Sequence, residues 1–352
     1  MREALNLAKK GLGFVSPNPC VGAVLVKDDQ IIGQGYHAQA GDDHAEVIAI
    51  NEAGSLAKDA YLFVTLEPCN HHGKTPPCAE LIVKSGIKKV FISCKDNNPQ
   101  VSGRGIEYLK SNNVEVDLGI LENEAIALNQ GFFHRMKEKK PYIKIKIASS
   151  LDGNTSLKTG ESKWITSEHS RDDVQKLRAH SCAILSGVGT VNSDNPKLNV
   201  RGRNHDKQPK RFILDSHLSI KSNLEILQQE NVFVVYGDDP NNNLSKLKNI
   251  KAKLIQMPQK NNRIDLSYVI SYFNEFGINN LLVEAGPTLS GAMIESGFFN
   301  DLIIYIAPVL LGSEANNLIK LTQIKTMKQR INFSYKDIRS IGSDIRITLE
   351  SI

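Results

Sequence analysis

The chain has 352 residues, of which 41% are hydrophobic and 23% are charged, and its formal net charge is +5. This length exceeds what one hydrophobic core usually supports, so we expect two domains in an ordinary soluble globular protein. The mild positive charge suits anionic small molecules such as phosphates, and it lacks the strong basic bias of a dedicated nucleic-acid-binding protein.

No apolar run is long enough to cross a bilayer, and the N-terminal residues lack the apolar core of a secretory signal. The five cysteines are scattered and odd in number, which indicates metal binding or buried thiols rather than a disulfide framework. We therefore expect a cytoplasmic protein without membrane partners.

The first part of the chain alternates strand and helix patterns. Residues 1–13 predict a short amphipathic helix that ends at Gly11 or Gly13. The apolar runs 22–27 and 31–37 flank three polar residues and predict a β-hairpin. Next come predicted helices at 44–54 and from about Pro77, predicted strands at 61–66 and 88–93, then a helix and a strand near 114–119. Such alternation indicates a layered α/β sheet.

A charge run ends at Lys140, just before Pro141, and predicts a linker or helix end between two units. The expected domains are therefore residues 1–140 and 141–352. The second begins with a strand pattern at 141–153. Further predicted strands lie at 211–215, 232–237, 279–286 and 301–308, and polar loops at 199–210 and 241–243.

The strongest chemical pattern joins His44 and Glu46 with Cys69 and Cys78. One imidazole and two thiolates fit a catalytic zinc site that keeps its fourth position for water. Zinc lowers the pKa of that water to near neutrality. Glu46, two residues after the predicted ligand His44, would shuttle protons rather than bind the metal. Because Cys78 opens a predicted helix, the helix N-terminus is expected to favour its thiolate form.

Each of these residues alone has an ordinary explanation, such as a helix cap or an inert core thiol. Together and in this order they match the H-x-E…P-C signature of zinc deaminases. The signature has two residues between its cysteines, whereas here Cys69 and Cys78 are separated by residues 70–77.

The longer segment between the two cysteines resembles that of a known enzyme family. The sequence EPCNHHGKTPPC resembles the bifunctional deaminase–reductases of riboflavin biosynthesis, as do Pro17–Gly22, Gly35–His37 and Asp96–Pro99. The resemblance implies an N-terminal cytidine-deaminase-like, three-layer α/β/α domain with one zinc ion. It also implies that Asn18 and His71 face the pyrimidine and that Lys74 meets the ribose phosphate. The alternative for Lys74 is an ordinary solvated lysine.

The second half has neither a G-x-G-x-x-G nor a Walker motif, which indicates neither a Rossmann site nor a P-loop. A buried strand runs into Gly286-Pro287-Thr288 and then a helix, a junction whose backbone amides suit a pyrophosphate. Such junctions are also common structural turns.

Residues 146–153, 159–166, 185–201 and VEAGPTL resemble the reductase domain of the same family, which implies a dihydrofolate-reductase-like α/β fold with NADPH across a mixed sheet. The motifs themselves show no basic pocket for a 2′-phosphate, so NADPH rather than NADH follows from the resemblance alone. The implied cofactor residues are Ala148, Trp164, Thr190, Asp194, Ser216, Gly286, Pro287, Thr288, Leu289, Ser290, Gly291 and Ala292. The implied substrate residues are Ser162, Arg178, Leu198, Arg201 and Glu284. Core packing for Trp164 and a turn cap for Asp194 are the alternatives.

The resemblance implies deamination of 2,5-diamino-6-ribosylamino-4-pyrimidinone 5′-phosphate and then NADPH-dependent reduction of the ribosyl group of the product. The partners are phosphorylated pyrimidines rather than nucleic acid, and the enzyme is expected to form a homo-oligomer. Two alternatives stay open: a deaminase that acts on a flipped base in tRNA, and a catalytically silent protein that keeps the fold as a scaffold.

Overall fold

The structure is a computed structural model, and it describes residues 1–70, 76–98, 102–202 and 207–352. The chain divides into two compact units, Met1–Lys140 and Pro141–Ile352. Within the described residues, no helix is long and apolar enough to span a bilayer.

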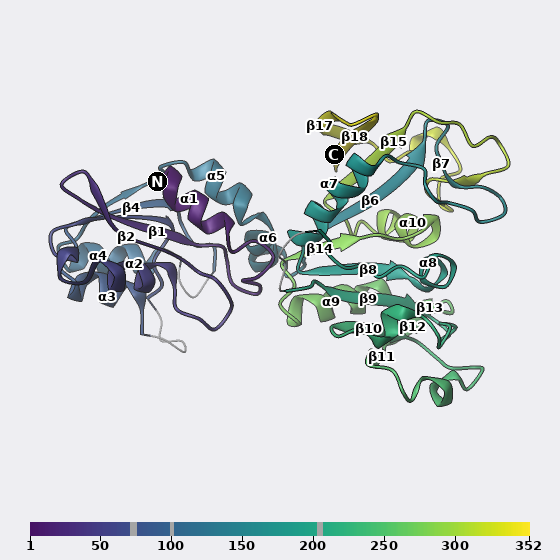
Figure 1. The fold of residues 1–352 in the computed structure, drawn as a ribbon, viewed down its shortest axis with the longest axis horizontal. Helices are drawn as coiled ribbons and strands as arrows, with labels where there is room; N and C mark the ends of the chain where they lie inside the picture. The colour runs from purple at the N-terminus through teal and green to yellow at the C-terminus, as the bar shows by residue number, and fades with distance from the viewer. Residues whose placement is uncertain (71–75, 99–101, 203–206) are drawn as a thin grey trace. The chain divides into compact units, whose positions relative to one another are not determined.

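The first unit is a sheet with helices on both faces (Figure 1). Its strands follow the order β2-β1-β3-β4-β5. They are β1 (Gly22–Lys27), β2 (Gln30–Tyr36), β3 (Tyr61–Leu66), β4 (Lys89–Cys94) and β5 (Glu115–Leu118). The helices are α1 (Arg2–Lys9), α2 (Ala45–Ala53), α3 (Cys78–Lys84), α4 (Arg104–Ser111), α5 (Glu122–Leu128) and α6 (Gln130–Glu138).

Two hydrophobic clusters cover the faces of this sheet. Helices α2, α3 and α4 pack on one face through residues such as Ala49, Ile82 and Leu109. On the other face, Leu5 of α1 and Ala125 of α5 meet Phe132 and Phe133 of α6. The expected three-layer arrangement follows, because the central strands β1, β3 and β4 bury side chains on both faces.

Glycines in β2 set the distance between this strand and α2. A Cβ atom added at Gly33 would lie 2.2 Å from the Ala49 carbonyl oxygen, and one at Gly35 would lie 2.4 Å from that of Ala45. Only glycine allows the helix to approach so closely. Helix α2 thereby carries its first residues, next to His44, onto the sheet.

The second unit is a mixed sheet in the order β11-β10-β9-β8-β14-β6-β15-β18-β17. Its pairs from β11 to β15 are parallel, and β18 and β17 add antiparallel strands at one edge. The sheet strands are β6 (Tyr142–Ser150), β8 (Ala183–Gly187), β9 (Lys210–Asp215), β10 (Val232–Tyr236), β11 (Lys253–Gln256), β14 (Asn280–Val283), β15 (Asp301–Ala307), β17 (Phe333–Ile341) and β18 (Asp344–Ser351).

Short ladders and helices complete this unit. The small ladders pair β12 (Gln259–Lys260) with β13 (Arg263–Ile264), and β7 (Asn154–Ser156) with β16 (Asn316–Asn317). The helices are α7 (Glu168–Ala179), α8 (Val188–Asp194), α9 (Leu266–Glu275) and α10 (Pro287–Glu295). Residues of α9 and α10, such as Phe273 and Met293, belong to the largest buried cluster, which packs on one face of the sheet. Val191 of α8 joins a second cluster, and Val174 of α7 packs with Tyr305.

Candidate active sites

The first unit brings the side chains of His44, Cys69 and Cys78 together. His44 is the residue before α2, Cys69 follows β3, and Cys78 is the first residue of α3. One ligand atom from each residue lies within 4.8 Å of the others. The starts of α2 and α3 therefore meet beyond the carboxyl end of β3, the central strand of the sheet.

The separations of these ligand atoms fit a zinc ion. His44 Nδ1 lies 3.2 Å from Cys78 Sγ and 3.6 Å from Cys69 Sγ. Tetrahedral zinc with ordinary bond lengths separates its nitrogen and sulfur ligands by about 3.5 Å. One nitrogen and two sulfur donors also match the ligand types of catalytic zinc, with a fourth position left for water.

A hydrogen bond between the Cys69 and Cys78 thiols moves their pKa values in opposite directions. The hydrogen bond from the Cys78 thiol lowers the pKa of Cys69 to about 4. The same bond, together with burial, raises the pKa of Cys78 well above its ordinary value. Bound zinc would take both sulfurs as thiolates, the form in which cysteine coordinates a metal.

Glu46 is buried in the first turn of α2, beside this cluster. Burial raises the pKa of its carboxyl to about 7, against the opposing effect of His44. A carboxyl group that gains and loses a proton near neutral pH suits general acid–base catalysis. The structure thus places a proton carrier next to the ligand set.

Asn18 is linked to the cluster through His37. The Asn18 side-chain amide lies 3.0 Å from His37 Nε2, and His37 Nδ1 lies 3.1 Å from the Asp43 carbonyl oxygen. Since the carbonyl can only accept, Nδ1 carries the proton and Nε2 accepts from Asn18. The His37 ring meets His44 edge to face at 5.4 Å between centroids. His37 was not among the predicted site residues, although it ends the quoted Gly35–His37 motif.

Glu67, the first residue of the Glu-Pro-Cys motif, binds backbone amides just after β4 and at the start of α4. Its Oε2 accepts hydrogen bonds from the amides of Asp96 and Gly103, and its Oε1 accepts from those of Gly105 and Ile106. The side chain is buried. This role was not predicted, because its partners lie 29 to 39 positions further along the chain.

Two predicted substrate residues, His71 and Lys74, lie outside the described residues. The contacts expected of these two residues therefore rest on the sequence resemblance alone.

The second unit holds a cavity of about 1220 Å³ at the carboxyl ends of its parallel strands. Lys146 and Ala148 of β6, Gly187 of β8, Asp215 of β9 and Glu284 after β14 all line it. Ligands of open α/β sheets bind at this edge. The volume exceeds that of an ordinary small-molecule pocket and suits two ligands side by side.

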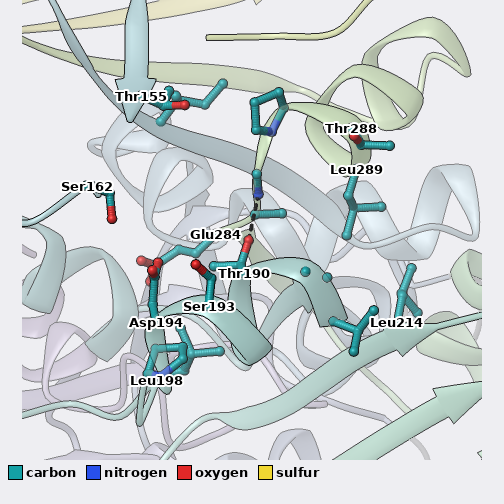
Figure 2. A pocket seen from close by; sticks show the side chains of 18 of the residues that line it. Thr155, Ser162, Thr190, Ser193, Asp194, Leu198, Leu214, Glu284, Thr288 and Leu289 are labelled. Carbon is teal, nitrogen blue, oxygen red and sulfur yellow. Dashed lines mark hydrogen bonds between the residues drawn. The ribbon is translucent and has the colours of Figure 1, made fainter. Parts of the chain in front are cut away.

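Most of the predicted reductase residues line this cavity. They are Ala148, Ser162, Trp164, Arg178, Thr190, Asp194, Leu198, Arg201, Ser216, Glu284, Gly286, Pro287, Thr288, Leu289 and Ala292. Figure 2 shows Thr190 and Asp194 of α8 near Glu284, with Thr288 and Leu289 of α10 on another side. Ser290 and Gly291 lie behind the lining: the Ser290 hydroxyl donates to the Ala285 carbonyl, and Gly291 packs against the backbone of Lys320.

A charged cluster forms one wall of the cavity. Arg178 Nε donates to Glu284 Oε1 at 2.6 Å, and Lys146 Nζ lies 3.3 Å from Glu284 Oε2. Burial alone would raise the pKa of Glu284, but the charges of Arg178 and Lys146 outweigh it and lower the pKa to about 2. Lys146 was not predicted as a site residue, although it starts the quoted segment 146–153. The period-two pattern of YIKIKI places Lys144 and Lys146 on the same face of the strand.

Two alternatives from the sequence can be compared with the structure. Trp164 is 68% exposed on the cavity wall, with the Arg171 guanidinium 4.6 Å from its ring centroid, so it is not a core residue. Asp194 ends α8, its carbonyl oxygen accepts from Lys163 Nζ, and it faces the cavity in Figure 2.

The backbone amides at the start of α10 differ in whether they are already hydrogen-bonded. The Gly286 amide donates to Thr190 Oγ1 at 3.0 Å, and Pro287 has no N–H group. The amides of Thr288 and Leu289 are therefore the ones placed to meet a phosphate at the start of α10.

Residues 141–347 match the family model of the RibD C-terminal domain. Residues 1–94 match that of the cytidine and deoxycytidylate deaminase zinc-binding region. The chain is 44% identical over 353 residues to the riboflavin biosynthesis protein RibD of Bacillus amyloliquefaciens, with 99% of this chain and 94% of that protein covered. This chain belongs to the RibD family. The RibD protein of Escherichia coli K12 is 41% identical over 363 residues, with 99% of this chain and 98% of that protein covered.

Solved RibD structures agree along the whole chain. Acinetobacter baumannii RibD, form 1, is 41% identical with a TM-score of 0.90, and the match covers 100% of this chain and 97% of that one. A Thermotoga maritima protein is 32% identical with a TM-score of 0.87 and the same coverage. It is described as a diaminohydroxyphosphoribosylaminopyrimidine deaminase/5-amino-6-(5-phosphoribosylamino)uracil reductase.

Membership of the RibD family confirms the predicted fold class, with a cytidine-deaminase-like domain followed by a RibD reductase domain. It also confirms a bifunctional enzyme of riboflavin biosynthesis with deaminase and reductase activities. The predicted cofactors, zinc in the deaminase domain and NADPH in the reductase domain, are confirmed by the same matches and by the His/Cys cluster.

Proposed function

We propose that residues 1–140 hydrolyse the 2-amino group of 2,5-diamino-6-ribosylamino-4(3H)-pyrimidinone 5′-phosphate, and that residues 141–352 reduce the ribosyl group of the product to a ribityl chain. The observation that carries the proposal is the buried carboxyl of Glu46 beside His44, Cys69 and Cys78. The charged cavity of the second unit supports the reductase half.

For deamination, His44, Cys69 and Cys78 would hold the metal. When bound, zinc supplies a water molecule whose pKa lies near neutrality. Overall, the oxygen of water bonds to C2 of the ring, and the bond from C2 to the amino nitrogen breaks to release ammonia. Glu46 would first move one proton of the water to the ring nitrogen. It would then move the second proton, from the hydroxyl now on C2, to the departing amino group, which leaves C2 as a carbonyl carbon.

The pyrimidine would be held by Asn18 and His71, and the ribose phosphate by Lys74. The hydrogen bond between the Asn18 amide and His37 supports this role, because the His37 ring itself packs edge to face on the His44 ring. Such fixing by a neighbouring hydrogen bond positions a group that has to recognise a planar ring edge.

For reduction, the substrate would lie against Ser162, Arg178, Leu198, Arg201 and Glu284. The two arginines suit its phosphate, since a guanidinium binds phosphate oxygens bidentately. When bound, NADPH would supply the hydride for the sugar carbon that bears the amine, while the bond from this carbon to the ring oxygen breaks and that oxygen takes up a proton. The cavity residues orient the two ligands and exclude water, and the amides of Thr288 and Leu289 are placed for the pyrophosphate.

We also infer a homo-oligomer in the cytoplasm. Strand β17 is an edge strand of the large sheet, and Tyr335 and Ile338 on it are 70% and 57% exposed. A long edge with exposed apolar side chains favours pairing with another chain. A reducing compartment keeps the thiols of Cys69 and Cys78 available for zinc. Light scattering during gel filtration tests the oligomer, and a mass equal to one chain contradicts it.

Replacing Glu46 with Gln separates the two proposed reactions. The variant should bind zinc and lose deamination by at least about a hundredfold. Reduction of the supplied deaminated substrate should stay at the wild-type rate. Equal loss of both activities in a variant that still contains zinc would contradict the assignment of two separate sites.

A further inference from the structure

One end of the reductase cavity lies two strand positions along the sheet from the charged wall. The strand order β9-β8-β14 separates β9 from the strand that leads to Glu284. Ser216 and His217, directly after β9, line the cavity, as do Asn261, Asn262 and Arg263. With the substrate at Arg178 and Glu284, this end is left for the adenosine half of a dinucleotide.

A short hairpin holds Arg263 at this end. Lys260 pairs with Arg263 across the β12–β13 ladder, and the two loop residues, Asn261 and Asn262, have φ angles of 52° and 57°. Two positive φ angles are typical of the tight turn that joins hairpin strands, and asparagine tolerates them. Arg263 is therefore presented by a defined turn.

Ser216 ties this hairpin to β9 by two hydrogen bonds. Its hydroxyl accepts from the Ile264 amide at 3.1 Å, and its carbonyl oxygen accepts from Gln259 Nε2 at 2.7 Å. The residue after β9 and the residue next to Arg263 are thus fixed to each other.

The acidic groups of this region are already engaged. Asp215, the last residue of β9, is 1% exposed and accepts from the Ser219 hydroxyl and the Ile220 amide. Asp238 Oδ1 lies 2.7 Å from His217 Nδ1. NAD-specific sites commonly offer a carboxylate to the ribose 2′-hydroxyl, whereas NADP sites offer an arginine. Here the carboxylate of Asp215 is buried, and each of its oxygens already accepts a hydrogen bond within the protein.

Arg263 has the opposite character. Its side chain is exposed and lines the cavity. Within the described residues it makes no side-chain hydrogen bond or ion pair. Its guanidinium can therefore meet a phosphate monoester without first breaking a protein contact.

We propose that Arg263 binds the 2′-phosphate of NADPH beside Ser216 and thereby sets the preference of the reductase for NADPH over NADH. The inference rests on the proposed reductase function of this cavity. The same guanidinium chemistry would suit the 5′-phosphate of the substrate, so the test separates the two sources.

The first measurement is calorimetric titration of the full-length protein with adenosine 2′,5′-bisphosphate and with 5′-AMP. Wild-type protein should bind the bisphosphate more tightly. Arg263→Gln should weaken the bisphosphate by about tenfold or more and leave 5′-AMP unchanged. Lys260→Gln is the matched control, since Lys260 is exposed on the same hairpin but lies outside the lining residues, and it should leave both affinities unchanged.

The second measurement is steady-state reduction with each dinucleotide. Arg263→Gln should raise KM for NADPH by about tenfold while KM for NADH and for the pyrimidine substrate stay the same. Equal weakening of NADPH and NADH would assign Arg263 a structural role and overturn the proposal. A rise in KM for the pyrimidine, with unchanged bisphosphate binding, would assign the phosphate to the substrate and also overturn it.

Different results would contradict the reductase function and the role of Arg263. If wild-type protein binds neither nucleotide and reduces nothing, the reductase function and this inference both fall. If wild-type protein reduces its substrate with NADPH and Arg263→Gln keeps the same preference, the inference on Arg263 falls alone.

Discussion

Arg178 and Glu284 form a two-point ion pair on the wall of the reductase cavity. Arg178 Nε donates to Oε1 at 2.6 Å and Nη2 donates to Oε2 at 3.0 Å. The side chains are 11% and 7% exposed. Arg178 Nη1 also donates to the Asn199 carbonyl, which joins α7 to the segment that precedes Arg201. These contacts connect α7, the end of β14 and the segment before Arg201 within one wall.

Replacing Glu284 with Gln should destabilise the second unit by about 3 kcal/mol, because it leaves two buried cations without a counter-charge. The control is Glu225→Gln, which removes an exposed partner of Lys197 and should cost less than about 1 kcal/mol. Urea unfolding of the full-length variants measures both. Equal stability of the two variants would contradict the description of the cluster.

The same carboxyl predicts a pH dependence of stability. Its pKa is lowered from 4.5 to about 2 in the folded protein. A folded-state pKa below the unfolded value means that the stabilisation is complete above pH 4.5 and is lost as the pH falls toward 2. The melting temperature of wild-type protein should therefore fall more steeply below pH 4.5 than that of Glu284→Gln. Parallel slopes for the two proteins would be the contrary result.

Glu67 should stabilise the deaminase unit through its four backbone hydrogen bonds. An amide in Glu67→Gln points N–H groups at backbone donors, so we expect a loss of about 2 kcal/mol. Glu107→Gln, on the exposed side of α4, is the control and should change stability little. Denaturant unfolding followed by deaminase assays reports both effects. Wild-type stability in Glu67→Gln would contradict this role.

Zinc binding should depend on Cys69 and not on Cys182. Cys69→Ser should lower bound zinc from about one ion per chain to near zero and abolish deamination, while reduction is kept. Cys182 lies in the second unit, where its sulfur accepts from the Asn280 amide, so Cys182→Ser should keep its zinc. Metal analysis after gel filtration gives the answer. Full zinc content in Cys69→Ser would show that the ligand set is wrong.

Local patterns predicted the elements that carry strong apolar periodicity. Strand β3 spans residues 61–66 as expected, and β2 ends one residue earlier than predicted, at Tyr36. Helices α5 and α6 and the pair β17–β18 were not predicted. The sequence of β17 lacks the regular alternation that predicts a half-buried strand. In the structure, Tyr335 and Ile338 of this strand are exposed. In β18, apolar residues do alternate at Ile345, Ile347 and Leu349, so the sequence contained enough information to predict this strand.

The sites differ in how far the sequence reveals them. His44, Cys69 and Cys78 stand within 35 positions and match the known order of ligands in zinc deaminases, so the sequence alone reveals them. Arg178 and Glu284 are 106 positions apart, and only the parallel strand order brings them together. Resemblance named both residues, whereas their ion pair and the contact with Lys146 needed the fold. Arg263 has no motif, because its position depends on two hydrogen bonds to Ser216.

The most direct test of the two-domain account is mass analysis of the products formed by zinc-loaded, full-length protein from the diaminopyrimidinone ribotide. Without NADPH, the mass of the substrate should change by the replacement of one amino group by an oxo group. With NADPH, the product should gain two further hydrogens. An unchanged substrate in both reactions, with zinc bound, would contradict the proposed substrate class.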